Sequence, residues 1–268
     1  MRKSSRSLGF VTLIAISVIA AALTSIIIPL KLQSSHAIKD GTSNTMIYSG
    51  ARASIAVSDN YIYLTWWDNK TGNNEVFFAA SNDGGKTFDK EINLSNAKGG
   101  SADSQVSAQG NNVYVTWWDN KTGDWKVFSR SSNDNGKTFG DAVSIKSIGN
   151  SPVKTLKAPP SNTISVDTVV VASGNNEYVA WWDNTTGNWE ISFAKSSDGG
   201  KTFGDSINIS NSSDARSIGA RMAAEGNNVY IAWIDIDKNT GQKQVLFRES
   251  NDNGQTFEKP IMVSSNSK

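Results

Sequence analysis

An eight-residue pattern that occurs four times constrains the fold of this chain more than any other feature. The pattern is Ser-x-Asp-x-Gly-x-Thr-Phe, and its copies begin at residues 81, 132, 196 and 250. Repeats at this spacing indicate stacked supersecondary units, and periods of about 40–50 residues are typical of β-propeller blades. The fixed residues of the four copies are Ser81, Asp83, Gly85, Thr87, Phe88; Ser132, Asp134, Gly136, Thr138, Phe139; Ser196, Asp198, Gly200, Thr202, Phe203; and Ser250, Asp252, Gly254, Thr256, Phe257.

Each repeat is predicted to contain four strands. A mixed first strand is followed by a Gly-Asn-Asn type turn, whose residues tolerate the positive φ of tight hairpins. The second strand is the most apolar, and its lack of alternation indicates burial on both faces. The second and third strands are expected at Tyr61–Trp67 and Glu75–Ala80, Val113–Trp118 and Trp125–Ser131, Tyr178–Trp182 and Trp189–Lys195, and Val229–Ile234 and Lys243–Glu249.

The box lies in the hairpin between the third and fourth strands, and its residue types suit a structural role there. The Asp carboxylate can accept hydrogen bonds from loop amides. Gly permits a left-handed backbone, and Phe can turn inward as an apolar plug. We therefore interpret the box as an element that holds the fold together. Replacing Asp83 or Phe88 with Ala is predicted to lower stability.

This pattern resembles the Asp box, or BNR repeat, of sialidases and other β-propellers, over about residues 50–264. The resemblance implies an all-β propeller of four Asp-box repeats, each a four-stranded antiparallel blade, where sialidases have six. The box occurs in propellers with unrelated roles, so it does not imply a reaction.

Ring closure admits two interpretations. The stretch Ser43–Gly50 precedes the first unit, and its Met46-Ile47-Tyr48 could close the ring by pairing into the last blade or compete there with Ile261-Met262-Val263. Alternatively the ring stays open and two chains associate. Because exposed sheet edges invite aggregation, a ring closed within one chain is the expectation.

Residues 1–37 are interpreted as a signal peptide or a signal-anchor transmembrane helix. Basic residues precede an uncharged, mostly apolar run over residues 8–30, and Ser35-His36-Ala37 would serve as a cleavage site. The run is close to the length that spans a bilayer, so an uncleaved anchor and a cleaved signal both stay open. Both place the rest of the chain outside the cell or on the extracellular face.

The remaining residues, 38–268, are expected to form one propeller domain. Its repeats cover about residues 50–95, 101–146, 164–210 and 216–264, with an insertion at 146–163 that contains Pro152, Pro159 and Pro160. This composition predicts a surface loop, which either lines a binding face or is passive.

Composition excludes several classes of function. The formal charge of +1 gives no electrostatic basis for nucleic-acid binding. The chain has no Cys and one His, His36, so the repeats cannot form a thiolate or multi-histidine metal site or a His-based triad. No calcium-loop spacing is complete, and we expect neither metal nor cofactor.

Sialidases, by resemblance, bind the substrate carboxylate with three arginines, use an Asp as acid/base and use a Tyr assisted by Glu as nucleophile. The Arg-Ile-Pro element of that family is missing. Four of the tyrosines beyond residue 50 occupy one repeat position and are interpreted as structural. The catalytic candidates, at or near the first strands, are Arg52, Arg216, Arg221, Asp103 and Asp167.

Tryptophans provide the candidate ligand-binding groups. The pairs at residues 66–67, 117–118 and 181–182 recur at one repeat position, which indicates core packing. Trp125 and Trp189 lie next to hairpin turns and are expected to be partly exposed, where they could stack on glycan or simply cap a blade.

These observations predict an exported or membrane-tethered propeller that acts as a binding module for a glycan or for a cell-envelope or other protein partner. The alternatives are an exo-α-sialidase-like glycoside hydrolase and a scaffold or assembly factor that binds protein only. Enzymatic activity stays open, with binding favoured. An oligomer is expected if the ring is open.

Overall fold

The computed structural model describes residues 53–149 and 168–264, and every strand in these ranges belongs to one of four four-stranded antiparallel sheets. We call the sheets blades 1 to 4. Blade 1 contains β1 (Ser54–Ser58), β2 (Tyr61–Asp68), β3 (Glu75–Ser81) and β4 (Ile92–Asn93). Blade 2 contains β5 (Ser101–Gln109), β6 (Asn112–Asp119), β7 (Lys126–Ser132) and β8 (Val143–Ser144). Blade 3 contains β9 (Val169–Ser173), β10 (Asn176–Asp183), β11 (Glu190–Ser196) and β12 (Ile207–Asn208). Blade 4 contains β13 (Ala215–Glu225), β14 (Asn228–Asp237), β15 (Lys243–Ser250) and β16 (Ile261–Ser264).

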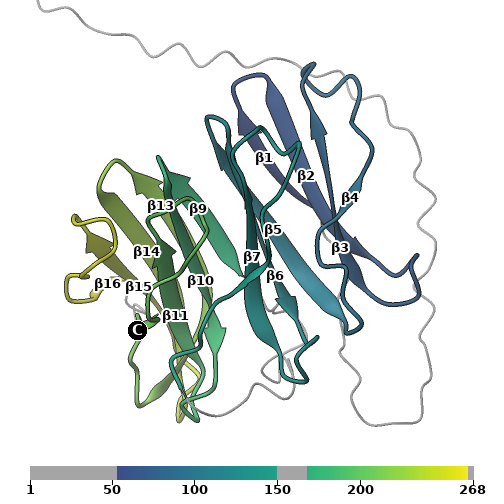
Figure 1. Cartoon of the computed structure of the whole chain (residues 1–268). Helices are drawn as coiled ribbons and strands as arrows, with labels where there is room; N and C mark the ends of the chain where they lie inside the picture. Colours follow the sequence, from purple (N-terminus) through teal and green to yellow (C-terminus); the bar gives the residue numbers. More distant parts are fainter. Residues whose placement is uncertain (1–52, 150–167, 265–268) are drawn as a thin grey trace, which may run out of the picture. The chain divides into compact units, whose positions relative to one another are not determined.

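In each blade the strands are hydrogen-bonded in chain order, as predicted from the repeats. The blades lie side by side in chain order, and the first strands β1, β5, β9 and β13 contact one another in turn (Figure 1). The core lies in three apolar clusters, one between each pair of consecutive blades.

The second strands have both faces covered wherever a blade has two neighbours. Trp117 of blade 2 lies in the cluster with blade 1, whereas the adjacent Trp118 lies in the cluster with blade 3. Trp181 and Trp182 divide in the same way between blades 2 and 4. The prediction that the tryptophan pairs form the core is confirmed for residues 117–118 and 181–182, and alternation of side chains along a strand explains it. Trp66 and Trp67 of blade 1 are only half-buried.

The box forms the same hydrogen-bonded hairpin in all four blades. In blade 2, Ser132 Oγ donates to Asp134 Oδ1 at 2.6 Å and accepts from the Gly136 amide at 2.9 Å. Asp134 also accepts from the Thr138 amide and hydroxyl at 2.9 and 2.5 Å. Gly136 has a φ of 78°, which L side chains rarely adopt. The Ser, Asp, Gly and Thr of each box are thus hydrogen-bonded to one another within the hairpin.

These hydrogen bonds hold the pKa of the box carboxylates low. The pKa of Asp83 falls to about 2, mainly through the Thr87 hydroxyl and amide. For Asp134 and Asp198, burial opposes the shift, but hydrogen bonds from Ser and Thr still lower the pKa to about 2. Because the folded pKa lies below the unfolded value, this stabilisation is present above about pH 4 and is lost as the pH falls through 2.

We therefore expect Asp134→Asn to lower the free energy of unfolding at pH 6 by roughly 1 kcal/mol, because neutral amides make weaker hydrogen bonds than carboxylates in an exposed loop. The difference from the unmodified protein should shrink between pH 4 and pH 2. Thermal melts of both proteins across that range measure it. A difference that stays constant with pH would show that the charge of Asp134 does not matter.

The inner strands of blades 2 and 4 are each interrupted by a β-bulge. The bulge lets β5 and β13 continue pairing beyond an irregular step. Among the described residues, no contact like those between successive first strands joins β13 to β1, and the ring closure expected through residues 43–50 stays a prediction. β16 occupies the outer position of blade 4, and the stretch 43–50 lies outside the described residues.

No helix within residues 53–149 and 168–264 is long and apolar enough to cross a membrane. The apolar run at 8–30 and most of the insertion at 146–163 lie outside the described residues.

Candidate binding site at the ends of the inner strands

Three of the sequence-predicted site residues lie in or beside the bulges of the inner strands β5 and β13. Asp103 occupies the bulge of β5, and Gly219 occupies the equivalent bulge of β13. Both have positive φ values, 52° and 66°. A left-handed Asp on a strand is uncommon and is found where surrounding contacts hold it.

Asp103 joins blade 2 to blade 3. Its Oδ2 accepts a hydrogen bond from the Thr168 amide at 2.8 Å, and its backbone carbonyl accepts from the Thr168 hydroxyl at 3.2 Å. Its side chain is buried. The adjacent Ser104 hydroxyl is buried and has no hydrogen-bond partner among the described residues. This corner is therefore polar and closely packed, and Asp103 has a positioning role within it.

Two of the candidate arginines lie on β13, one on each side of its bulge. Arg216 is opposite Ile236 and Arg221 is opposite Ala232. Arg216 is half-buried, whereas Arg221 is exposed and donates a hydrogen bond from Nη1 to the Ala220 carbonyl at 2.8 Å. They belong to blade 4 and Asp103 belongs to blade 2, with blade 3 between them. Arg52 and Asp167 lie outside the described residues.

The carboxylates at the ends of the second strands support structure. Asp119 accepts hydrogen bonds from the Ser101 hydroxyl and the Trp117 indole at 3.1 and 3.2 Å. Asp235 accepts from Ser217 and Trp233 at 2.6 and 2.8 Å. Burial raises the pKa of Asp235, and those two bonds oppose the rise. Each of these oxygens therefore satisfies a polar group of its own blade.

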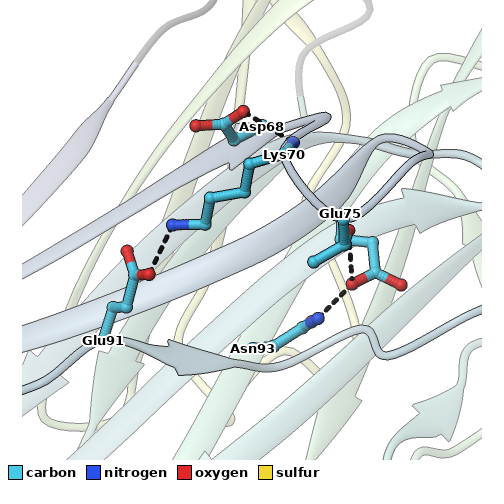
Figure 2. Close-up of polar contacts among 6 residues, drawn as sticks. Asp68, Lys70, Glu75, Glu91 and Asn93 are labelled. Atoms are coloured by element: carbon cyan, nitrogen blue, oxygen red, sulfur yellow. Dashed lines mark hydrogen bonds and ion pairs between the residues drawn. The ribbon is translucent and has the colours of Figure 1, made fainter.

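A second set of polar contacts fixes the hairpins and connections at the same end of blade 1. Lys70 forms an ion pair with Glu91, and Asn93 donates to Glu75 (Figure 2). Glu75 also accepts from the Thr71 hydroxyl at 3.2 Å and the Ala97 amide at 3.1 Å. Glu190 of blade 3 repeats this role by accepting from Ser210 and the Ser212 amide. These carboxylates are therefore structural rather than paired for acid/base chemistry.

The predicted partial exposure of Trp125 is wrong, whereas Trp189 is half-buried, in keeping with the prediction. Trp125 is 8% exposed and lies in the core between blades 2 and 3. Trp189 packs edge-on against Trp182 with ring centroids 6.2 Å apart. Both rings therefore pack in the apolar clusters between blades.

The tyrosines at the shared repeat position are buried in blades 1 to 3. Burial raises the pKa of Tyr63 and of Tyr114 to about 12, which disfavours the phenolate that a nucleophile requires. Tyr61 stacks on Tyr63, and Tyr48 lies outside the described residues. The described tyrosines thus support packing rather than nucleophilic catalysis.

Arg130 and Arg248 bind consecutive blades together. Arg130 Nη1 donates to the Leu94 carbonyl of blade 1 at 2.9 Å, and Arg248 Nη1 donates to the Ile209 carbonyl of blade 3 at 2.8 Å. Among the described residues there is also no cluster of His, Cys, Asp and Glu that could hold a metal ion.

One buried carboxyl was missed by the sequence reasoning. Glu177 on β10 is fully buried at the box end of blade 3 and accepts from the Ser129 hydroxyl of blade 2 at 2.6 Å. The equivalent positions of the other blades hold Ile62, Val113 and Val229. The sequence does show that a Glu replaces a branched apolar residue at this repeat position, and this could have identified Glu177 as a buried carboxyl. Because it lies at the box end, it does not belong to the candidate binding site.

No family profile and no curated protein sequence matches the chain. Among solved structures, it is similar to the GH93 α-L-arabinofuranosidase of Fusarium graminearum in complex with arabinobiose, with a TM-score of 0.55 and 16% identity over 81% of this chain and 66% of that one. It is also similar to the Hadza microbial sialidase Hz136, with a TM-score of 0.51 and 13% identity over 77% of this chain and 45% of that one. A structure of NanB with Optactamide gives a TM-score of 0.52 and 10% identity over 82% and 54%.

The chain thus spans about half to two thirds of the length of these structures. At such low identity the likeness concerns the fold alone. This chain is an all-β protein whose four sheets resemble the blades of sialidase and arabinofuranosidase propellers.

Proposed function

We propose that this protein is a non-catalytic binding module that holds an acidic glycan through the ends of its inner strands. The proposal is supported by the structural roles of the described carboxylates and tyrosines, which leave none of these groups placed as a catalytic acid, base or nucleophile. Asp103, Asp119 and Asp235 hold neighbouring segments, and the shared tyrosines are buried. A glycosidase needs a carboxylate pair at a defined separation around the scissile bond.

Arg216 and Arg221 give this site its chemical preference. A guanidinium presents several donors in a planar fork that matches a carboxylate or a sulfate. Both arginines lie beside a bulge whose Gly219 brings no side chain, so a ligand can approach the backbone of β13 closely. A glycan with an acidic sugar would satisfy both features.

We further infer that the repeated hairpins are Asp boxes of the BNR type, since they combine the motif with its hydrogen bonds in all four blades. The N-terminal run is inferred to export the domain, either as a cleaved signal or as an anchor. The site would then face the outside of the cell, where glycans and envelope proteins are present.

Binding of the protein to an array of acidic and neutral glycans tests the proposal. We expect acidic glycans to be retained, and Arg221→Ala to weaken binding about 10- to 100-fold, as for the loss of a charge-assisted hydrogen bond. Lys259→Ala, an exposed cation beside the outer strand of blade 4, is the matched control and should bind normally.

Two results would direct attention to another function. Hydrolysis of fluorogenic sialosides or arabinofuranosides that Arg221→Ala abolishes would establish a glycosidase and overturn the binding-only proposal. No retention of any glycan, together with Arg221-dependent capture of an envelope protein, would overturn the glycan and favour the protein-binding scaffold.

A further inference from the structure

Every blade has a back face toward the preceding blade and a front face toward the next one. In blade 2 the back face packs against Tyr63 and Phe78 on the front face of blade 1. It consists of the apolar residues Val106, Ala108, Val113, Val115, Trp117 and Phe128. In blade 4 the same six repeat positions are Met222, Ala224, Val229, Ile231, Trp233 and Leu246, and they pack against blade 3.

Blade 1 carries an equally apolar back face, but no described blade precedes it. Its six equivalent residues are Ile55, Val57, Ile62, Leu64, Trp66 and Phe77. Cross-strand pairing of Ile55 with Leu64, of Val57 with Ile62, and of Trp66 with Phe77 puts them on one side of the sheet. Ile55 and Val57 are 63% and 61% exposed. Exposed apolar patches of this kind mark interaction surfaces.

Blade 4 has the opposite unpaired surface, a front face. There Tyr230 stacks on Phe247 with ring centroids 6.2 Å apart at an interplanar angle of 18°. The stacks Tyr63–Phe78 and Tyr178–Phe193 have nearly the same geometry, at 6.1 Å and about 20°. Those four rings are fully buried, whereas Tyr230 and Phe247 are half-buried.

The box of the following blade covers each buried stack. A Cβ added at Gly136 would lie 2.7 Å from the Phe78 ring, and Phe139 packs edge-on against Phe78 at 4.9 Å. Blade 4 repeats this arrangement on blade 3, since Gly254 lies against Phe193 and Phe257 packs edge-on against it at 5.0 Å. The interface thus requires a bare Gly and a Phe from the next box.

The box of blade 1 has both residues and no stack to cover. A Cβ added at Gly85 would meet only Ile62 of its own blade within 4 Å, and Phe88 is 42% exposed. Phe88 is therefore not the apolar plug that the sequence predicts, because the plug needs a preceding blade.

We propose that a second copy of this chain occupies both surfaces, so that blade 4 of each copy packs on blade 1 of the other and two chains close a ring of eight blades. The two surfaces complement each other and not themselves, because the stack lies on one and the Gly–Phe box on the other. A head-to-tail contact of this type leaves an unpaired face at each end of the assembly unless the ring closes. Eight blades lie within the usual propeller range.

Cross-linking of single-Cys variants tests this pairing, and the absence of native Cys makes the background clean. Full-length Phe88→Cys and full-length Phe247→Cys are purified in detergent, mixed, and treated with a short bismaleimide. We expect the mixture to give a covalent two-chain product. Its yield should exceed that of either variant alone on the order of a hundredfold, because docked side chains meet at a millimolar effective concentration.

A second reporter and a control make the result specific. Glu249 lies on the same front face, at the position where Lys195 of blade 3 reaches the Asn253 carbonyl in the next box at 3.2 Å. Glu249→Cys should therefore also cross-link to Phe88→Cys, and it avoids disturbing the aromatic stack. Asn239→Cys, in the β14–β15 hairpin at the other end of the blade, should not.

Three outcomes would overturn the proposal. No product from either reporter while the melting curves stay native would show that the faces do not meet. Intramolecular cross-linking of a Phe88→Cys/Glu249→Cys chain, with no two-chain product in the mixture of single variants, would show that the chain closes on itself. A ladder of three or more chains from the double variant would contradict the closed pair.

Discussion

Replacing Glu177 with Gln should stabilise the protein at pH 8 by roughly 4–5 kcal/mol and leave it unchanged below about pH 4.5. Burial raises the pKa of Glu177 to about 8, against a hydrogen bond from Ser129 that favours the carboxylate, and with a smaller upward contribution from the charge of Asp198. A shift of this size corresponds to about 1.4 kcal/mol for each pH unit between the unfolded and folded pKa values.

The pH dependence of stability has this sign because the proton on Glu177 binds more tightly in the folded than in the unfolded state. The folded pKa of Glu177 is above the unfolded value, so the folded state keeps a proton that the unfolded chain has already lost. Stability is therefore full below the unfolded pKa near 4.5 and declines as the pH rises toward 8. Gln has no proton to lose, and its amide oxygen can still accept from Ser129.

Chemical denaturation at pH 5, 6, 7 and 8, followed by tryptophan fluorescence, measures the effect. Few other side chains titrate between pH 5 and pH 8, because the chain contains one His, at position 36, and no Cys. The unmodified protein should lose stability steadily across it, while the Gln variant stays level. Equal and flat curves would mean that the Glu177 carboxyl is hydrated and titrates normally.

The same site shows how far the repeats allow prediction. At the position of Phe78, Phe193 and Phe247, blade 2 has Ser129, and at the position of Ile62, Val113 and Val229, blade 3 has Glu177. Each departure is visible in the sequence alone. Only the structure shows that they meet, with the carboxyl taking the place of the missing ring beside Gly200.

Repetition predicted the local structure well because each repeat supplies the same turn chemistry and the same alternation of buried side chains. The four hairpins of the box and the order of strands follow from these short-range signals. The bulges at Asp103 and Gly219 could not be predicted from these signals, because a bulge depends on contacts between strands rather than on a residue pattern. Trp125 was misplaced for a related reason, since its burial comes from blade 3.

The candidate site was harder to predict than the fold. Repeat alignment placed Asp103, Arg216 and Arg221 at or near the first strands of their repeats, and in the structure they lie on β5 and β13. The alignment of repeats could not show that Asp103 accepts a hydrogen bond from Thr168 or that the two arginines flank one bulge. The candidate site consists of residues at which the repeats differ. A residue that occurs in one repeat only has no repeated pattern from which its contacts could be inferred.

Phe78→Ala should destabilise the protein by about 3–5 kcal/mol, whereas Phe247→Ala at the same repeat position should cost only about 1–2 kcal/mol in the dissociated chain. Phe78 is fully buried between blades 1 and 2, with Gly136 on its ring and Phe139 against its edge. Its removal leaves a cavity that the backbone of the box cannot fill, because the hydrogen bonds of Ser132 and Asp134 hold that backbone in place.

Phe247 makes the matched comparison because it keeps the stack with Tyr230 but has no covering box in its own chain. Equilibrium denaturation at submicromolar concentration isolates the intrinsic cost of each substitution. Raising the concentration should increase the cost of Phe247→Ala toward that of Phe78→Ala as copies associate, while the cost of Phe78→Ala changes little. Equal costs at low concentration would show that the stack itself stabilises the blade, and that the covering box adds nothing.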